Sequence, residues 1–110
     1  MANTFKNETL RASGTTLAPV GSAGASSTQT TIIGMTVANI VSSVISVGVK
    51  LVDSSANETW LVKDAPIPTG GALVVVGGDQ KVVMETGDII KVISNTASSM
   101  DVVMSYLEIT

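Results

Sequence analysis

The side chains that could do chemistry are mainly carboxylates, and three of them lie close together in the sequence. Asp79, Glu85 and Asp88 fall within one short stretch, and such a group can bind Ca²⁺ or supply a general acid and a general base. Asp79 and Asp88 each follow a glycine, however, and an aspartate beside a glycine is typical of a tight turn. We therefore interpret these carboxylates as turn residues and predict no metal site.

The usual catalytic side chains are missing from the composition. The 110 residues include no Cys and no His, which removes thiolate chemistry, the commonest general base and the commonest transition-metal ligand. Serine and threonine are abundant, but a hydroxyl nucleophile needs an adjacent base. Neither glycine-rich loop, Gly21–Gly24 nor Gly77–Asp79, matches a phosphate-binding fingerprint. The sequence thus predicts a protein that is not an enzyme, with no catalytic residues and no cofactor.

The core must be built from aliphatic side chains, because the only aromatic residues are Phe5, Trp60 and Tyr106. Charged residues make up 14% of the chain, against roughly 25% in an average soluble protein. A polar but weakly charged surface suits a protein that packs against other copies of itself or against other proteins. A soluble monomer of low charge is the alternative interpretation.

Charge and hydropathy also bear on the partners. The net charge is -3 and the six basic residues are scattered, so we expect no phosphate-binding patch and no nucleic-acid partner. The longest run of large apolar residues, Leu73–Val76, is far shorter than the roughly 20 residues that span a bilayer. We expect a soluble protein with no membrane partner.

The first 28 residues contain mostly small and hydroxyl side chains, and their large apolar residues are isolated. We interpret residues 1–28 as an extended N-terminal arm, with one strand near Phe5–Arg11 followed by a flexible loop. Two interpretations of the arm are open: a disordered tail, or a segment that becomes ordered by adding to a neighbouring subunit. Deleting residues 2–20 should then leave a folded domain formed by residues 29–110.

Alternation with a period of two predicts strands in that domain. One strand runs over Gln29–Asn39, and a second, Ile45–Leu51, has apolar residues on one face only. The turn Asp53–Asn57 precedes a short strand, Glu58–Lys63. Within it, Trp60 is expected to be partly buried in the core, with an interface anchor as the alternative.

The stretch Pro66–Gly71 contains two prolines, which removes two backbone donors, so it should be an ordered connection that crosses from one sheet to the other. A strand over Ala72–Val76 and a tight hairpin turn over Gly77–Gln80 follow. The last thirty residues, Lys81–Thr110, contain three β-rich runs separated by turn residues, which predicts a meander.

No segment carries a helical apolar stripe. The seven or eight short strands therefore predict an all-β protein, a single antiparallel β-sandwich of the jelly-roll-like or Ig-like type, with an extended N-terminal arm.

A series of short motifs occurs in order from Gly34 onward. They are Val37–Asn39, Val47–Leu51, Leu61–Gly70, Gly77–Lys81, Glu85–Asp88 and Asp101–Thr110. Together these motifs resemble the small virion structural proteins of tailed bacteriophages, of the capsid decoration (cement) type. The first thirty residues match that pattern poorly.

This resemblance implies a β-sandwich made in the host cytoplasm that assembles on the virion. It would bind the major capsid protein on the outer capsid surface, as a homo-oligomer that is a trimer at three-fold positions, or it would be an adaptor or fibre protein of the neck or tail. A carbohydrate-binding or Ca²⁺-binding module is a third hypothesis, although one exposed aromatic residue argues against sugar binding. The expected partner-binding residues are Phe5, Leu10 and Arg11 in the arm, and Trp60, Pro66 and Pro68 in the domain.

Overall fold

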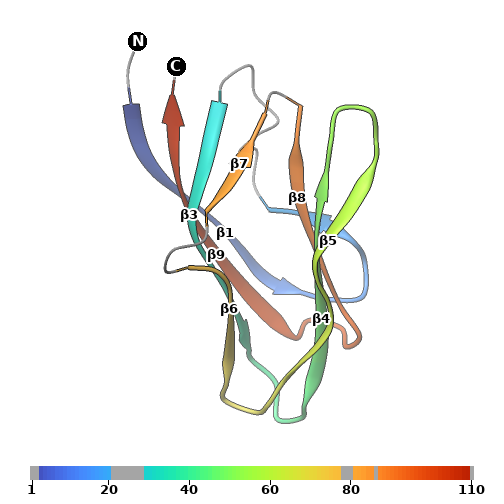
Figure 1. Cartoon of the computed structure of the whole chain (residues 1–110). Helices are drawn as coiled ribbons and strands as arrows, with labels where there is room; N and C mark the ends of the chain where they lie inside the picture. The colour runs from blue at the N-terminus through green and yellow to red at the C-terminus, as the bar shows by residue number, and fades with distance from the viewer. Residues whose placement is uncertain (1–2, 21–28, 78–80, 86, 110) are drawn as a thin grey trace.

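The computed structural model describes residues 3–20, 29–77, 81–85 and 87–109. These residues form nine strands and no helix (Figure 1). The strands are β1 (Asn3–Ser13), β2 (Ala18–Pro19), β3 (Gln29–Asn39), β4 (Ile45–Val52), β5 (Glu58–Ile67), β6 (Ala72–Val76), β7 (Val82–Met84), β8 (Ile89–Ser94) and β9 (Met100–Ile109).

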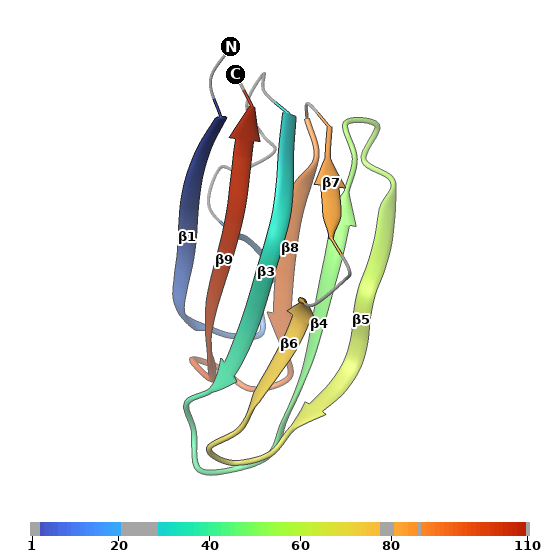
Figure 2. The same cartoon turned by 60° about the vertical axis from the view of Figure 1, so that its left-hand side comes forward.

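The strands form two antiparallel sheets that face each other, as the two views of Figures 1 and 2 show. One sheet has the order β1-β9-β3-β6, with β7 also paired to β3, and the other has the order β2-β8-β4-β5. The predicted β-sandwich is therefore confirmed. The two chain ends lie side by side, because Asn3 and Ile109 are partners in the β1–β9 ladder.

The order of the strands distinguishes the two predicted types of sandwich. Strands β6 and β7 both pair with the same edge of β3, at Met35–Ala38 and at Thr30–Ile32 respectively, and both run antiparallel to it. They act as one interrupted strand, which gives eight strands in jelly-roll connectivity. Among the described strands, β4 and β5 are the one sequential pair that is hydrogen-bonded, so the hairpins of an Ig-like sandwich are not formed.

The predicted meander and the predicted hairpin at Gly77–Gln80 are both wrong. Strands β7, β8 and β9 exist where the sequence indicated, but β7 and β9 pair with β3 while β8 pairs with β4 and β2. Residues 78–80 lie outside the described residues, but β6 and β7 on either side run in the same direction along β3. Turn residues indicate where the chain changes direction; they do not specify which strand comes next to which.

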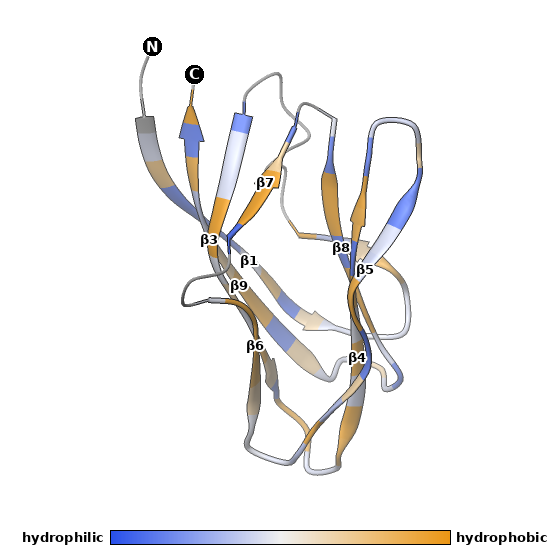
Figure 3. Cartoon of the chain, viewed as in Figure 1, coloured by the Kyte–Doolittle hydropathy of each residue, from blue (hydrophilic) through white to orange (hydrophobic). Residues whose placement is uncertain are grey.

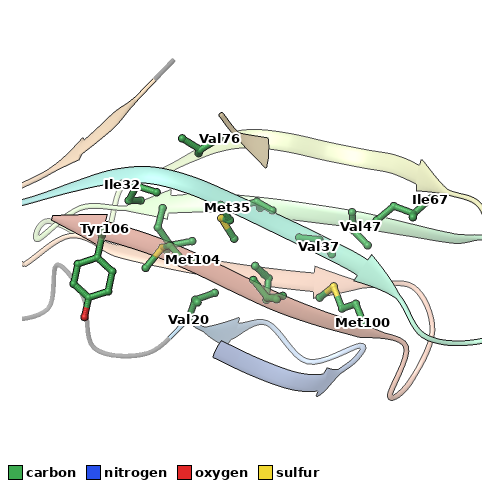
Figure 4. Packing of buried hydrophobic residues seen from close by; sticks show 14 of the residues in the cluster. Val20, Ile32, Met35, Val37, Val47, Ile67, Val76, Met100, Met104 and Tyr106 are labelled. Carbon is green, nitrogen blue, oxygen red and sulfur yellow. The ribbon is translucent and has the colours of Figure 1, made fainter. Parts of the chain in front are cut away.

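The core between the sheets is aliphatic, as the composition predicted, and Tyr106 is its one aromatic member (Figure 4). Hydrophobic residues occur on strands of both sheets (Figure 3). Along β9, buried residues alternate with more exposed ones from Met100 to Leu107, because alternate side chains of a strand point to opposite faces. The fully buried side chains come from both sheets and include Ile32, Met35, Ile45, Ile67, Met84, Ile90, Met100 and Met104.

The predicted N-terminal arm is part of the sandwich over its described residues. A strand near Phe5–Arg11 is confirmed, but it spans Asn3–Ser13 and pairs with β9 of the same chain. The segment β2 pairs with β8, and Val20 is 1% exposed in the core. Residues 21–28 lie outside the described part. The boundary at residue 28 therefore does not separate an arm from a domain, and deleting residues 2–20 would remove an edge strand and part of the core.

Strand β5 extends beyond the predicted end at Lys63 and includes Pro66. It is an edge strand of its sheet, where a missing backbone donor is tolerated. Its pairing with β4 shifts register twice, and Asp64 has a positive φ of 53° beside one shift, as in a β-bulge. The predicted crossing between sheets is confirmed after Ile67, where a turn closed by the Gly71 N–H and the Pro68 carbonyl (2.9 Å) leads into β6.

Asn39 connects three chain segments at one end of the sandwich. Its side-chain amide is buried and donates to the carbonyl oxygens of Ser43 (2.8 Å), Ile67 (3.1 Å) and Pro68 (3.2 Å). Its side-chain oxygen accepts the N–H of Val41 (2.9 Å). These backbone groups lie in or beside the β3–β4 and β5–β6 connections, which pass from one sheet to the other. One side chain thus gives hydrogen-bond partners to backbone groups in both connections.

Replacing Asn39 with alanine should lower the free energy of unfolding by about 2 kcal/mol, because buried carbonyl and N–H groups would lose their partner. Urea denaturation measures the change. The matched control is Asn7→Ala at an exposed position, which should change stability by less than about 0.5 kcal/mol. Equal losses in the two variants would contradict the role of Asn39.

Tyr106 fastens β9 to β1 at the other end of the core. Its hydroxyl donates to Glu8 Oε1 at 3.2 Å, and the residue is 3% exposed. Burial, followed by the nearby Glu8 carboxylate, raises the pKa of Tyr106 to about 12. The folded protein therefore holds the phenol proton more strongly than the unfolded chain, whose tyrosine has a pKa of about 10.

The free energy of unfolding should accordingly fall as the pH rises from about 10 to about 12, since the unfolded chain ionises first in this window. Tyr106 is the only tyrosine, so the ultraviolet absorbance of tyrosinate reports its titration directly. The Tyr106→Phe variant should lack this part of the pH dependence. A tyrosine that titrates in the folded protein near its unfolded value would overturn the assignment.

Candidate interaction surfaces

Of the carboxylates Asp79, Glu85 and Asp88, the described part of the structure shows Asp88 as a turn residue. Asp88 is buried; its Oδ2 accepts the N–H of Glu85 (2.9 Å), and its own N–H donates to the Glu85 carbonyl (3.0 Å). The turn prediction is confirmed there, whereas Asp79 lies outside the described residues. Within residues 3–20, 29–77, 81–85 and 87–109, no three acidic, His or Cys residues come close enough to hold a metal ion.

The same described segments contain no helix long and apolar enough to cross a membrane.

The predicted partner-binding residues are divided between the two sheets. Phe5 lies on β1 and is 73% exposed, and Arg11 is exposed near the end of that strand. Leu10 points the other way and packs against the core. The remaining three, Trp60, Pro66 and Pro68, lie on β5 and in the turn after it, at the edge of the opposite sheet. The structure therefore does not assemble the six residues into one site.

Phe5 belongs to a continuous surface on the outer side of the sheet that contains β9. We define the Thr/Val face as the outward residues of this sheet, which are Phe5, Asn7 and Thr9 of β1, Val103, Ser105 and Leu107 of β9, Thr31, Gly34 and Thr36 of β3, Val74 of β6 and Val83 of β7. None of these eleven residues is charged, but the same side of the sheet continues into two charged residues, Asp101 of β9 and the exposed Arg11 of β1. The neighbouring Asp101, in the next row along β9, accepts the N–H of Ala12 at 2.9 Å.

The Thr/Val face is ordered in rows that cross the strands, because partners in adjacent strands point to the same side. One row runs Thr9, Val103, Thr36, Val74 from β1 to β6. A second row runs Phe5, Leu107, Thr31, Val83 from β1 to β7. Between them lies a row of smaller polar residues and glycine, Asn7, Ser105 and Gly34.

Four of the most exposed large apolar side chains lie on this face. The exposed fractions are 73% for Phe5, 64% for Val74, 63% for Val83 and 47% for Val103. Sequence reasoning missed the three valines, although the runs Leu73–Val76, Val82–Met84 and Val102–Met104 carried a signal. Uninterrupted apolar runs are typical of strands that are covered on both faces. In this sandwich each sheet is covered only on its inner face, so every second apolar residue of such a run is left on the outer face.

The prediction that Trp60 is partly buried in the core is wrong, because the side chain lies on the outer face of the other sheet and is 39% exposed. Its ring rests over Gly48: a Cβ atom at Gly48 would lie 2.6 Å from the ring. The ammonium groups of Lys50 and Lys63 lie 4.5 Å and 5.7 Å from the ring centroid, within the range of cation–π attraction. Lys50 also pairs with Glu58 at 2.8 Å, and this hydrogen bond lowers the pKa of the Glu58 carboxyl.

A shallow depression of about 160 Å³ lies beside the Trp60 ring. Its lining residues mix apolar, hydroxyl, amide and acidic groups and are Ser46, Gly48, Trp60, Asp64, Ile93, Ser94 and Asn95. The volume is below the roughly 300 Å³ at which small-molecule pockets begin. The size suits one inserted side chain of a partner protein better than a whole ligand.

A comparison with known protein families finds no family model that matches this chain, and a comparison with curated proteins finds no similar sequence. The likeness to phage virion proteins therefore stays a prediction made from the motifs.

Replacing Gly48 with alanine should push the Trp60 ring away from the sheet, since the new methyl group would overlap the ring. Trp60 is the only tryptophan, so its fluorescence emission should shift to longer wavelength and become easier to quench with iodide. Gly34→Ala is the matched control, because the nearest atom to its Cβ is 3.9 Å away. Unchanged emission in folded Gly48→Ala would contradict the stacked geometry.

Proposed function

We propose that this protein is a structural protein of a bacteriophage virion, of the capsid-decoration type, which binds the lattice of the major capsid protein and stabilises it without catalysing a reaction. The observation that carries the proposal is that both outer sides of the sandwich present side chains suited to protein contacts: the Thr/Val face on one sheet, and the exposed Trp60 ring beside a depression on the other. Five of the eleven residues of the Thr/Val face are large apolar side chains, and exposed apolar side chains that gather on one surface are typical of protein contact sites. Such a face is expected of a subunit that works by packing against other proteins.

Two further features support an assembly role over a ligand-binding role. The chain devotes its polar chemistry to its own connections, as with Asn39 and Asp88, whose side chains bond to backbone groups. The jelly-roll connectivity is also shared with many viral capsid proteins, which is an argument by analogy of fold alone. The order of the sequence motifs points to the same class.

The mechanism we propose is additive weak contact. A homo-oligomer presents the same outward side chains several times, and contacts that are modest in one subunit add when several subunits bind a repeating lattice. Trp60 with its neighbouring depression, on the sheet opposite the Thr/Val face, is the surface we assign to the capsid partner. Its aromatic ring and mixed polar surroundings are typical of residues that anchor a protein–protein contact.

The test is to locate the chain in particles of the phage that encodes it, by electron microscopy with a labelled antibody. We expect label over the whole head and binding of added protein to heads that lack it, saturating at a fixed ratio to the major capsid protein. Trp60→Ala should weaken this binding while leaving the sandwich folded. Label confined to the neck or tail would replace the decoration role with the adaptor or fibre alternative, and absence from the particle would overturn both.

A further inference from the structure

Strand β1 is the longest and most regular free edge of the described sandwich. It is the outer strand of its sheet (Figure 2), and its ladder with β9 keeps one register from Asn3 to Leu10. The other edges carry features that discourage pairing with a further strand. Strand β5 has Pro66 and two shifts of register, β2 is two residues long and includes Pro19, and the remaining edge is divided between β6 and β7.

The backbone groups that face the free edge of β1 follow from the ladders. A residue of an antiparallel strand directs its N–H and C=O to the same side, and that side alternates along the strand. The Ile40 N–H donates to the Ser99 carbonyl at 2.9 Å. This bond lies one step beyond the partners Asn39 and Met100, so these two form a non-hydrogen-bonded pair and Met100 directs its backbone groups toward β1. Every second residue of β9 after Met100 does the same, and their partners are the even-numbered residues of β1. The N–H and C=O groups left at the free edge are those of Phe5, Asn7 and Thr9.

The charges beside Asn7 select the strand that can use this edge. Lys6 and Glu8 flank Asn7 on the inner side of the sheet, where Lys6 pairs with Glu108 (3.1 Å) and Glu8 accepts the hydroxyl of Tyr106. A charge on an edge strand deters strands that offer no counter-charge. A second copy of β1, placed antiparallel with Asn7 opposite Asn7, brings Lys6 of each copy opposite Glu8 of the other. Centring the pair on Lys6 or on Glu8 would instead bring like charges together, which is destabilising.

We propose that two copies of this chain join edge to edge through β1, around a two-fold axis at Asn7. The inference rests on the proposed function only for its role in assembly, because it names the contact of the homo-oligomer and involves no capsid protein. Identical edges that meet in this way form a closed, isologous pair. The predicted trimer is a different arrangement, in which each subunit would bind a different surface of its neighbour.

Main-chain hydrogen bonds hold such a pair together, as in other cases where a strand is added to a sheet edge. The cross-copy pairs Phe5–Thr9, Asn7–Asn7 and Thr9–Phe5 have two hydrogen bonds each, about six in all. The exposed ring of Phe5 then lies against Thr9 of the other copy on the outer side of the sheet. Because the axis is perpendicular to the sheet, the two Thr/Val faces lie on the same side and form one continuous surface.

The experiment is a concentration series of the full chain by sedimentation equilibrium. The wild type should reach twice the 11.2 kDa mass of one chain. Lys6→Glu turns the two opposite-charge pairs into like-charge pairs and should weaken the pairing at least about tenfold. Lys63→Glu is the matched control, because it makes the same change of charge at an exposed position of the other long edge strand, β5; it should pair like the wild type.

Two further variants keep the test decisive. Mixing Lys6→Glu with Glu8→Lys should restore two-chain particles, because each charge then meets its opposite across the axis, whereas each variant alone pairs poorly. Asn7→Pro removes the central edge-facing N–H and should abolish the pairing, while circular dichroism should show an intact sandwich, since proline is tolerated at such an edge position. In the wild type, the amides of Phe5, Asn7 and Thr9 should exchange with solvent more slowly as the protein concentration rises.

A wild type that stays monomeric or forms a three-chain particle would overturn the inference, as would pairing that survives Asn7→Pro in a folded chain. Capsid binding by a monomer would leave the proposed function intact. Pairing without any association with virions would remove the function and keep the pair.

Discussion

The architecture depends on the double pairing of β9. This strand is hydrogen-bonded over nearly its whole length to β1 on one side and to β3 on the other. Its alternate residues therefore serve two purposes: Val102, Met104 and Tyr106 fill the core, while Val103 and Leu107 form the middle of the outer face. A change of register by one residue would exchange these two sets, so the core and the outer surface are fixed by the same backbone ladder.

Jelly-roll connectivity places a particular demand on the connections. Most of the connections cross from one sheet to the other. The backbone N–H and C=O groups of such a connection have no neighbouring strand with which to form hydrogen bonds. Side chains and neighbouring connections take over this role. Asn39 does so at one end, and the backbones of Gly14 and Ser98 come so close elsewhere that a Cβ at Gly14 would lie 2.8 Å from the Ser98 nitrogen. Small and amide-bearing residues are therefore part of the architecture, not only fillers of loops.

The sequence predicts the elements of this fold better than their arrangement. Alternation located β3, β4, β8 and β9 well, since each buries one face. It could not reveal which strands are neighbours, because pairing partners such as Thr36 and Val103 are far apart in the chain. The sequence does not distinguish strand β1 from an extended arm, because an edge strand needs few inward apolar residues. The sequence also does not place Trp60 on the outer face, because nothing near Trp60 in the chain shows that Gly48 lies beneath its ring.

The neighbouring chain ends have a practical meaning for anyone who re-engineers this molecule. Since Asn3 and Ile109 already lie opposite each other in one ladder, a short covalent link between the ends would close the backbone into a ring with little distortion. The sandwich would then be independent of where the polypeptide starts. New ends could be opened at an exposed turn such as the one at Ser54 and Ser55, and a circularly permuted chain would retain every strand pair that defines the two sheets.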